Sequence, residues 1–452
     1  MASKNNIDMT DGPLLPQLVA FAVPLMLSTL LQMVFNTADL IVVGRFCDHR
    51  ALAAVGASGA LYQIIIGTFL GLSGGASVVA ANAFGAKNVQ RTTLTVHTSI
   101  AIALYGGIVL GIVTPFFIRP LMLLLKTPPE VLDGAVLYMQ IICCSIPFIA
   151  LYNFGSSLLR SFGDSKSPMY YLAISGVLNV VLNLIFVIVF HMKVEGVALA
   201  TVIAQILSAA LVIRNLVKIN DPWRLQTKNF RIDPRTLKSI FSLGFPSGIQ
   251  TSCFALTNML IQSSVNSLGE MAMAGHTASA NIEAYVSIVD IAGFLVAMSF
   301  VGQNNGARKY HRLCRGIKYN LYCCLGATFA LSMLVLAFGR PLLSIYNNNP
   351  EVIEWGHSRM VVMMTSFVTV VFMDNIAGAL RGLEHPWMPM ITTLVGVCGF
   401  RTLWILLVFN RNRTMEHLMM SYPFSWSIVA VVTGIYLVWE CRRLLRRPDC
   451  AD

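Results

Sequence analysis

Twelve apolar runs, each long enough to cross a lipid bilayer, recur along the chain and leave little sequence for any other structure. A helix needs roughly 20 predominantly apolar residues to cross the hydrocarbon core of a membrane. The runs cover 14–43, 51–82, 93–118, 131–159, 168–190, 197–217, 237–267, 271–301, 317–338, 351–380, 389–409 and 419–439. Only 12% of the 452 residues are charged, whereas soluble domains usually have roughly 25%. The sequence therefore predicts an all-α polytopic membrane protein with twelve transmembrane helices.

The longest polar segment divides these runs into two groups of six. It extends over 218–236 and contains the string WRLQTKNFRIDPR. We therefore predict an N-terminal six-helix lobe over 1–217, a cytoplasmic linker over 218–236, a C-terminal six-helix lobe over 237–440, and a cytoplasmic tail over 441–452.

An internal repeat supports this division. Short motifs at the ends of the second and fourth spans and at the start of the fifth recur 221 residues later. The matched positions are Gly85 and Gly306, Arg160 and Arg381, and Pro168 and Pro389. The entry prolines Pro24 and Pro246 match at nearly the same offset. Because each half has an even number of spans, the two lobes are expected to be pseudo-symmetric about an axis along the membrane normal, an arrangement known in transporters.

The distribution of basic residues predicts the orientation. With the N-terminus inside, most of the 32 lysines and arginines fall in loops on the cytoplasmic side, including clusters in 214–238, 308–318 and 442–447. Cytoplasmic loops are enriched in Lys and Arg, so both termini are placed in the cytoplasm. Because topology accounts for the net charge of +11, there is no reason to invoke nucleic-acid binding.

The first span carries three polar side chains on one helical face. Gln32, Asn36 and Asp39 follow the i, i+4, i+7 spacing. Acidic groups at membrane depth are costly unless partnered, and they are functional candidates by default. We interpret Asp39 as the principal candidate and Gln32 and Asn36 as supporting polar groups. An interfacial charge at the end of the span is the competing interpretation for Asp39.

Two later spans of the same lobe carry amides and hydroxyls with i, i+4 spacing. These are Asn179 and Asn183 in the fifth span, and Thr201 and Gln205 in the sixth. If these faces meet that of Asp39, they form a pocket of oxygen ligands that could bind a proton or coordinate Na⁺. Hydrogen bonding between helices is the competing interpretation for each amide taken singly.

The second lobe has its polar groups at different places. Glu283 and Asp290 share one face of the eighth span, Asp374 lies in the tenth and Arg401 in the eleventh. We expect Arg401 to pair with Asp374 on the preceding helix. A structural ion pair, substrate binding and a proton relay all remain open for this group.

Catalytic and metal-binding interpretations find little support. Gly71–Gly75 matches GxSxG, but a nucleophile elbow requires a strand before the serine. Ser58 lies in a GxSG string, and its histidine base would have to be His97 or His276, both near span ends. The ten cysteines include no CxxC, and most lie in apolar runs, where they act as small hydrophobes. No enzyme activity, catalytic residue, structural metal or cofactor is predicted.

Several motifs together resemble those of one transporter family. They are Pro24, Asp39-x-x-x-x-Gly44, Phe84-Gly85-Ala86-Lys87, the segment 159–164 (LRSFGD) and the segment 302–307 (GQNNGA). This set resembles the multidrug and toxic compound extrusion (MATE) transporters, in particular the bacterial branch with DinF-like and MepA-like exporters. The resemblance covers essentially the whole chain.

This resemblance implies two six-helix lobes with a V-shaped central cavity. It implies export of drug-like organic molecules, often cations, in exchange for inward H⁺ or Na⁺, by a monomer in contact with the lipids of the bacterial cytoplasmic membrane. The family's N-lobe cation site falls on Asp39, Asn179 and Thr201. Members with the best-formed site have Asp where this chain has Asn183, which favours H⁺. In the second lobe, Asp374 lies near the family's tenth-helix acid.

Two other functions remain as alternatives. A flippase for lipid-linked saccharides, from the same superfamily, would need a strongly cationic cavity. The arginines and lysines here are instead assigned almost wholly to loops, with Arg359, near the start of its run, counted among the loop charges outside the membrane. Arg401 alone is assigned to the interior of a span. A scaffold or receptor without transport is disfavoured by the acids inside the spans.

Overall fold

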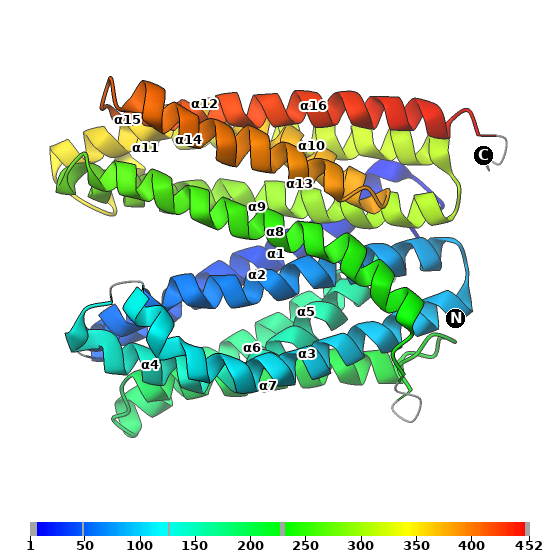
Figure 1. Ribbon diagram of the computed structural model, residues 1–452, viewed down its shortest axis with the longest axis horizontal. Helices are drawn as coiled ribbons and strands as arrows, with labels where there is room; N and C mark the ends of the chain where they lie inside the picture. The colour runs from blue at the N-terminus through cyan, green and yellow to red at the C-terminus, as the bar shows by residue number, and fades with distance from the viewer. Residues whose placement is uncertain (1–6, 48, 125–126, 227–230, 448–452) are drawn as a thin grey trace. The chain divides into compact units, whose positions relative to one another are not determined.

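The computed structural model describes residues 7–47, 49–124, 127–226 and 231–447, and every regular element in these ranges is a helix (Figure 1). The elements of the first half are α1 (Leu14–Phe46), α2 (His49–Gly85), α3 (Val89–Leu124), α4 (Pro129–Cys143), α5 (Ile146–Ser161), α6 (Lys166–Leu184), the π-helical turn η1 (Ile185–Val189) and α7 (Val194–Lys218).

The second half begins with α8 (Pro234–Asn266), and residues 227–230 of the predicted linker lie outside the described residues, as do 448–452 of the predicted tail. The remaining elements are α9 (Glu270–Gly306), α10 (Tyr310–Ala337), α11 (Gly339–Ser344), α12 (Pro350–Gly382), α13 (Trp387–Thr393), η3 (Leu394–Gly399), α14 (Phe400–Trp404), η4 (Ile405–Phe409), α15 (Met415–Met419) and α16 (Ser421–Leu444).

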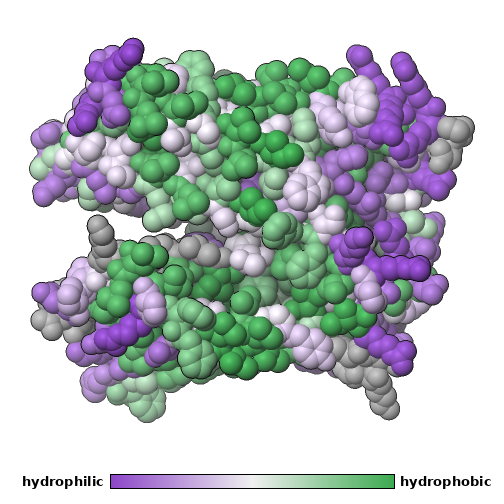
Figure 2. All heavy atoms as spheres, in the orientation of Figure 1, coloured by the Kyte–Doolittle hydropathy of each residue, from purple (hydrophilic) through white to green (hydrophobic). Residues whose placement is uncertain are grey.

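The predicted all-α membrane fold is confirmed, and each predicted run lies on a helix or on a chain of short helices. By length and composition, ten described helical segments can cross a membrane. An eleventh span is formed if α4 and α5, bent by 51° at a short break, are taken together. The twelfth predicted span is α8, which has 33 residues but is more polar than the others. Figure 2 shows apolar side chains gathered over the middle of the helices and hydrophilic ones at their ends, as a bilayer requires.

The described chain forms two compact units. Among the described residues, the first contains those before Met9 together with Leu27–Gly248, and the second contains Met9–Met26 together with those from Ile249 to Arg447. In the first unit α5 packs against α2, α3 and α7. In the second, α12 packs against α9, α10 and α16. The units thus differ from the predicted lobes, because α1 and α8 each contribute to both.

Both divided helices contain a proline near the point of division. Pro24 lies inside α1 and Pro246 inside α8, and each unit boundary follows two residues later. Proline removes a backbone donor and frees a carbonyl within a helix. Each helix nevertheless continues past its proline, so neither proline is a helix terminus.

Met9 and Thr10, just before α1, are held by other residues of the second unit. The Met9 backbone N–H donates to Gln303 Oε1 at 3.3 Å, and the Met9 carbonyl accepts from Asn304 Nδ2 at 3.1 Å and from Arg312 Nε at 3.0 Å. Lys309 Nζ donates to the Thr10 carbonyl at 2.9 Å. The end of α9 and the residues that follow it therefore anchor Met9 and Thr10.

The sequence repeat reappears in the backbone. Lys87 and Arg308, 221 residues apart, both have positive φ at the end of a long helix. Gly163 and Glu384 have the same separation and also have positive φ. Left-handed residues commonly end helices because they let the following N–H groups bond to the last free carbonyls. The repeated motifs thus encode the same helix stops in both halves.

Glycine allows α2 to approach the first part of α8 very closely within the first unit. A Cβ atom on Gly75 would lie 2.5 Å from the backbone nitrogen of Gly244 and 2.5 Å from the carbonyl oxygen of Ile240. Backbone atoms cannot move aside as flexible side chains do. In contrast, a Cβ on the neighbouring Gly74 would meet nothing within 4 Å.

We expect Gly75→Ala to destabilise the protein by about 1–3 kcal/mol, the usual cost of overpacking a tight contact. The thermal unfolding temperature of purified protein in detergent should fall. Gly74→Ala is the matched control, and its unfolding temperature should stay the same or rise slightly, since alanine is the better helix former. Equal unfolding temperatures for the two variants would contradict the close approach.

Candidate functional site

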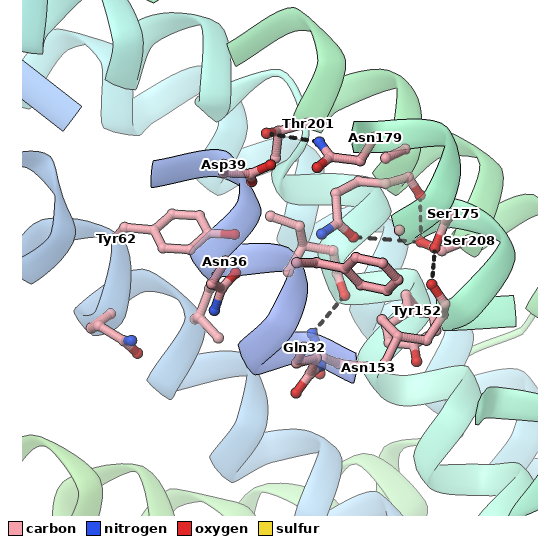
Figure 3. Close-up of a pocket in the computed structure, with 18 of the residues that line it drawn as sticks. Gln32, Asn36, Asp39, Tyr62, Tyr152, Asn153, Ser175, Asn179, Thr201 and Ser208 are labelled. Atoms are coloured by element: carbon pink, nitrogen blue, oxygen red, sulfur yellow. Dashed lines mark hydrogen bonds between the residues drawn. The ribbon is translucent and has the colours of Figure 1, made fainter. Parts of the chain in front are cut away.

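A cavity of about 360 Å³ in the first unit is lined by Asp39, the predicted cation-binding residue of α1, and by the two supporting polar residues of that helix (Figure 3). The i, i+4, i+7 spacing places Gln32, Asn36 and Asp39 on the wall of this cavity. Asn179 of α6 and Thr201 of α7 also line it. The three helical faces therefore converge, which is the condition on which the predicted pocket depended.

Hydrogen bonds connect the acid to the other helices. Asn183 Nδ2 donates to Asp39 Oδ1 at 2.5 Å and to Asn179 Oδ1 at 3.4 Å. Asn179 Nδ2 in turn donates to Thr201 Oγ1 at 3.4 Å. Asn183 is fully buried behind the cavity wall. These four side chains form one continuous network across α1, α6 and α7.

The network contains one carboxylate and several oxygen acceptors. Asn183 Oδ1 is buried without a hydrogen-bond partner, although its amide nitrogen makes two bonds. A buried acceptor without a partner costs about 1–3 kcal/mol, so this oxygen favours the arrival of a donor or cation. Among the described residues, no three His, Cys, Asp or Glu side chains are grouped to hold a metal ion. A single carboxylate can take up a proton, and the amide oxygens beside it are possible ligands for a monovalent cation.

Aromatic side chains complete the cavity, and our sequence reasoning missed them. Tyr62 of α2 and Tyr138 of α4 line it, and the ring of Tyr62 extends toward α1 in Figure 3. Tyrosines are common in apolar runs, so no spacing signal distinguished these two. They give the cavity flat apolar walls beside its polar network.

A second cavity, of about 350 Å³, lies within the second unit. All three C-lobe candidates line it, namely Glu283 of α9, Asp374 of α12 and Arg401 of α14. The aromatic rings of Tyr422 and Trp426, both on α16, form part of its wall. The structure therefore brings together the polar residues that the sequence singled out in this half.

The predicted pairing of Arg401 with Asp374 is wrong. Arg401 Nε donates to Ser425 Oγ at 3.0 Å, and its guanidinium carbon lies 3.8 Å from the ring centroid of Tyr422. Asp374 instead interacts with the carboxyl group of Asp290 on α9. Helix order suggested α12 as the partner of Arg401, but the side chain turns toward α16, where stacking on an aromatic ring stabilises a guanidinium.

The acid that does pair with an arginine here is Glu283. Its Oε2 lies 2.6 Å from Nη2 of Arg359, and Arg359 Nη1 donates to Ser279 Oγ at 3.0 Å. Our prediction placed Arg359 with the loop charges outside the membrane, but this side chain is only 4% exposed. Counting basic residues on each side of the membrane could not show that Arg359 points from α12 into the interior of the unit.

The residues considered for catalysis have structural roles. Ser58 Oγ donates to the Ala54 carbonyl of its own helix at 2.8 Å. His97 Nδ1 lies 2.8 Å from the Thr93 carbonyl, and its Nε2 accepts from the Gln226 backbone N–H at 3.0 Å. His97 thus holds the segment after α7 against α3.

Comparison with known sequences identifies the relatives of this chain. A family model described as MatE matches residues 24–185 and 246–405. The probable multidrug resistance protein YoeA of Bacillus subtilis is 25% identical over 94% of both chains. The probable multidrug resistance protein NorM of Thermotoga maritima is 24% identical over 87% of this chain and 86% of its own. The multidrug export protein MepA of Staphylococcus saprophyticus is 23% identical over 77% of both.

Solved structures show the same fold. One described as an outward-facing conformation of a multidrug resistance MATE family transporter of the MOP superfamily matches with a TM-score of 0.91. Another, a MOP superfamily transporter from Pyrococcus furiosus, matches with a TM-score of 0.92. Both are 19% identical and cover 99% of this chain and all of theirs. At that identity, the likeness establishes the fold alone.

Proposed function

The chain belongs to the MatE family of membrane transporters, and from this membership we propose that it is a secondary active multidrug exporter. It is a multi-pass membrane transporter and not an enzyme. In the proposed function, organic drugs, often cationic, leave the cell while H⁺ or Na⁺ enters. Drug and ion would be carried in opposite directions by alternating access, in which the protein exposes its binding sites to each side of the membrane in turn. We place it in the cytoplasmic membrane with both termini inside, as its basic loops favour.

One observation carries this proposal, namely that Asp39 lines a cavity and bonds directly to Asn183. An acid at membrane depth is costly, and natural proteins place such groups on ion and substrate pathways. Here the acid has one amide partner and opens to a space of about 360 Å³, within the range of small-molecule sites. Uptake of a cation at Asp39 would alter the network that links it to Asn179 and Thr201.

We propose H⁺ as the coupling ion, with Na⁺ as the alternative. Na⁺ needs several oxygen ligands, and Asn183 presents its NH₂ group rather than an oxygen to Asp39. A proton needs only the single carboxylate, which it neutralises completely. The unpartnered Asn183 Oδ1 is a buried acceptor that would favour Na⁺ if the amide turned.

Transport by purified protein in liposomes tests the proposal. A pH gradient, acidic on the side toward which the drug moves, should drive ethidium or norfloxacin against its own concentration gradient. A Na⁺ gradient at constant pH should drive little or none. Drug movement that responds to neither gradient, across a panel of organic cations, would overturn the proposed exporter.

The flippase alternative draws on the two arginines of the second cavity, since lipid-linked saccharides carry phosphate groups. Arg359 and Arg401 both line that cavity, but Glu283 is paired with the first, and Asp374 adds a second acid. The cavity has no cationic excess when both acids are ionised. Translocation of a fluorescent lipid-linked pyrophosphoryl saccharide in the same liposomes, independent of any ion gradient, would favour the flippase.

A further inference from the structure

We infer that the cavity of the second unit is a binding site for the carboxylate group of an aromatic substrate, with Arg401 as its anchor. The inference rests on the proposed function only in taking the ligand to be a transported substrate. It narrows the proposed drug-like substrates, at this cavity, to those that carry a carboxylate on an aromatic ring system.

The first observation is a guanidinium with an unused donor. Arg401 is only 1% exposed, and its Nη2 is buried without a hydrogen-bond partner. Nε is occupied by Ser425 Oγ. An unpaired charge buried in protein is strongly unfavourable, so this end of the side chain gains stability when an anion arrives. The group lines a cavity of about 350 Å³, which gives an anion room to reach it.

The second observation is that the other charges around the cavity already have partners. Glu283 is paired with Arg359 at 2.6 Å. Asp374 interacts with Asp290 behind the cavity wall, and Arg381 also acts on it electrostatically. Neither acid forms an ion pair with Arg401 in the described part of the chain. Arg401 therefore has no ion-pair partner among the described residues, and Glu283 acts on it only electrostatically, at longer range.

The third observation concerns the shape of the ligand. The guanidinium of Arg401 lies 3.8 Å from the centroid of Tyr422 and 5.6 Å from that of Trp426. These two rings and Phe254 of α8 line the same cavity. A planar guanidinium binds a carboxylate through two parallel hydrogen bonds, and aromatic rings pack well against one another. A flat aromatic acid matches this combination.

The local backbone also marks this position. Arg401 lies on α14, a five-residue α-helical segment between the π-helical segments η3 and η4. Short π-helical segments within a longer helix are rare, and they occur frequently at functional sites. They set which way side chains point along a helix, and here they flank the residue that carries the unused donor.

Calorimetric titration of the purified protein in detergent tests the inference without requiring transport. The ligands are 2-naphthoate and 2-naphthamide, which share their ring system and differ in charge. We expect naphthoate to bind and naphthamide to bind at least roughly tenfold more weakly, since loss of a buried charge-assisted pair has effects of that size or larger. Equal binding of the two ligands, or binding of neither, would overturn the inference.

Variants locate the site. Arg401→Gln should bind naphthoate no better than naphthamide. If that variant does not fold, Arg401→Lys keeps the charge but loses the planar donor pair, and it should weaken naphthoate binding severalfold. The matched control is Arg381→Lys, another arginine beside an aromatic ring, with its guanidinium carbon 4.9 Å from the centroid of Phe294 but outside the lining of this cavity.

The two arginine-to-lysine variants should therefore differ in naphthoate affinity, and the same loss in both would count against the site. The titration also separates this inference from the proposed function. Selective naphthoate binding without any gradient-driven transport would support the carboxylate site and contradict the proposed exporter function. Gradient-driven transport of ethidium without tighter binding of naphthoate than of naphthamide would support the exporter function and contradict the carboxylate site.

Discussion

Liposomes containing Asp39→Asn should show no drug movement driven by a pH gradient beyond that of protein-free liposomes. The substitution keeps the size of the side chain and its capacity to accept from Asn183 Nδ2, the bond of 2.5 Å in the native chain. It removes the charge that a proton or Na⁺ would neutralise. Because the amide can keep one hydrogen bond, we expect the free energy of unfolding to change by no more than about 1 kcal/mol.

Asp133→Asn is the control for this experiment. Asp133 lies on α4, its side chain is 81% exposed, and it pairs with Arg119 across 3.3 Å. Exposed pairs of this kind contribute about 0–1 kcal/mol, so transport and stability should remain native. Native transport in Asp39→Asn would remove Asp39 from the coupling mechanism and direct attention to Asp374 and Glu283.

The second large effect is expected from Asn183→Asp, which should make the protein depend on Na⁺. The new carboxylate would lie beside Asp39, where two unit charges about 4 Å apart repel by roughly 4 kcal/mol at an effective dielectric constant of about 20. A cation between them would relieve this repulsion, and carboxylate oxygens are suitable ligands. Thermal unfolding in NaCl should occur at a higher temperature than in choline chloride, and a Na⁺ gradient should drive drug transport.

A second new acid in the same cavity provides the comparison. Asn153 lines the cavity from α5, and its Nδ2 donates to the Ile149 carbonyl of its own helix at 2.9 Å rather than to Asp39. Asn153→Asp should leave unfolding insensitive to Na⁺. If both variants respond to Na⁺ alike, the effect reflects added charge in the cavity and not a site at Asp39.

The fold and the first site could be predicted in large part from sequence, for a physical reason. Apolar length defines a span, and helical periodicity determines which side chains share a face. Those two rules gave the polar faces of the three helices, the family resemblance grouped Asp39, Asn179 and Thr201, and the structure brings these three into one cavity. The polar linker and the motifs repeated 221 residues apart gave the division into related halves, which the matching positive φ values at Lys87 and Arg308 reflect in the backbone.

The second cavity could not be predicted equally well, because its partners depend on the direction in which each side chain leaves its helix. Arg401 was assigned to Asp374 from the order of the spans, yet it stacks on Tyr422. Arg359 was taken for a loop charge but pairs with Glu283 inside the unit. The π-helical segments beside Arg401 rotate the faces of that helix, and no spacing rule for regular helices anticipates such a rotation.

The shared helices α1 and α8 have a consequence for how the protein can be divided. Met9–Met26 clusters with the second unit, and the part of α8 before Ile249 clusters with the first. A cut in the linker would therefore produce two fragments, neither of which is a complete unit. The N-terminal fragment would contain Met9–Met26, which belongs to the second unit, and the C-terminal fragment would contain the part of α8 that belongs to the first. Neither fragment is expected to fold alone, whereas the pair synthesised together in one cell should assemble. We therefore expect the two units to fold cooperatively, with the first unit completed only after α8 has been synthesised.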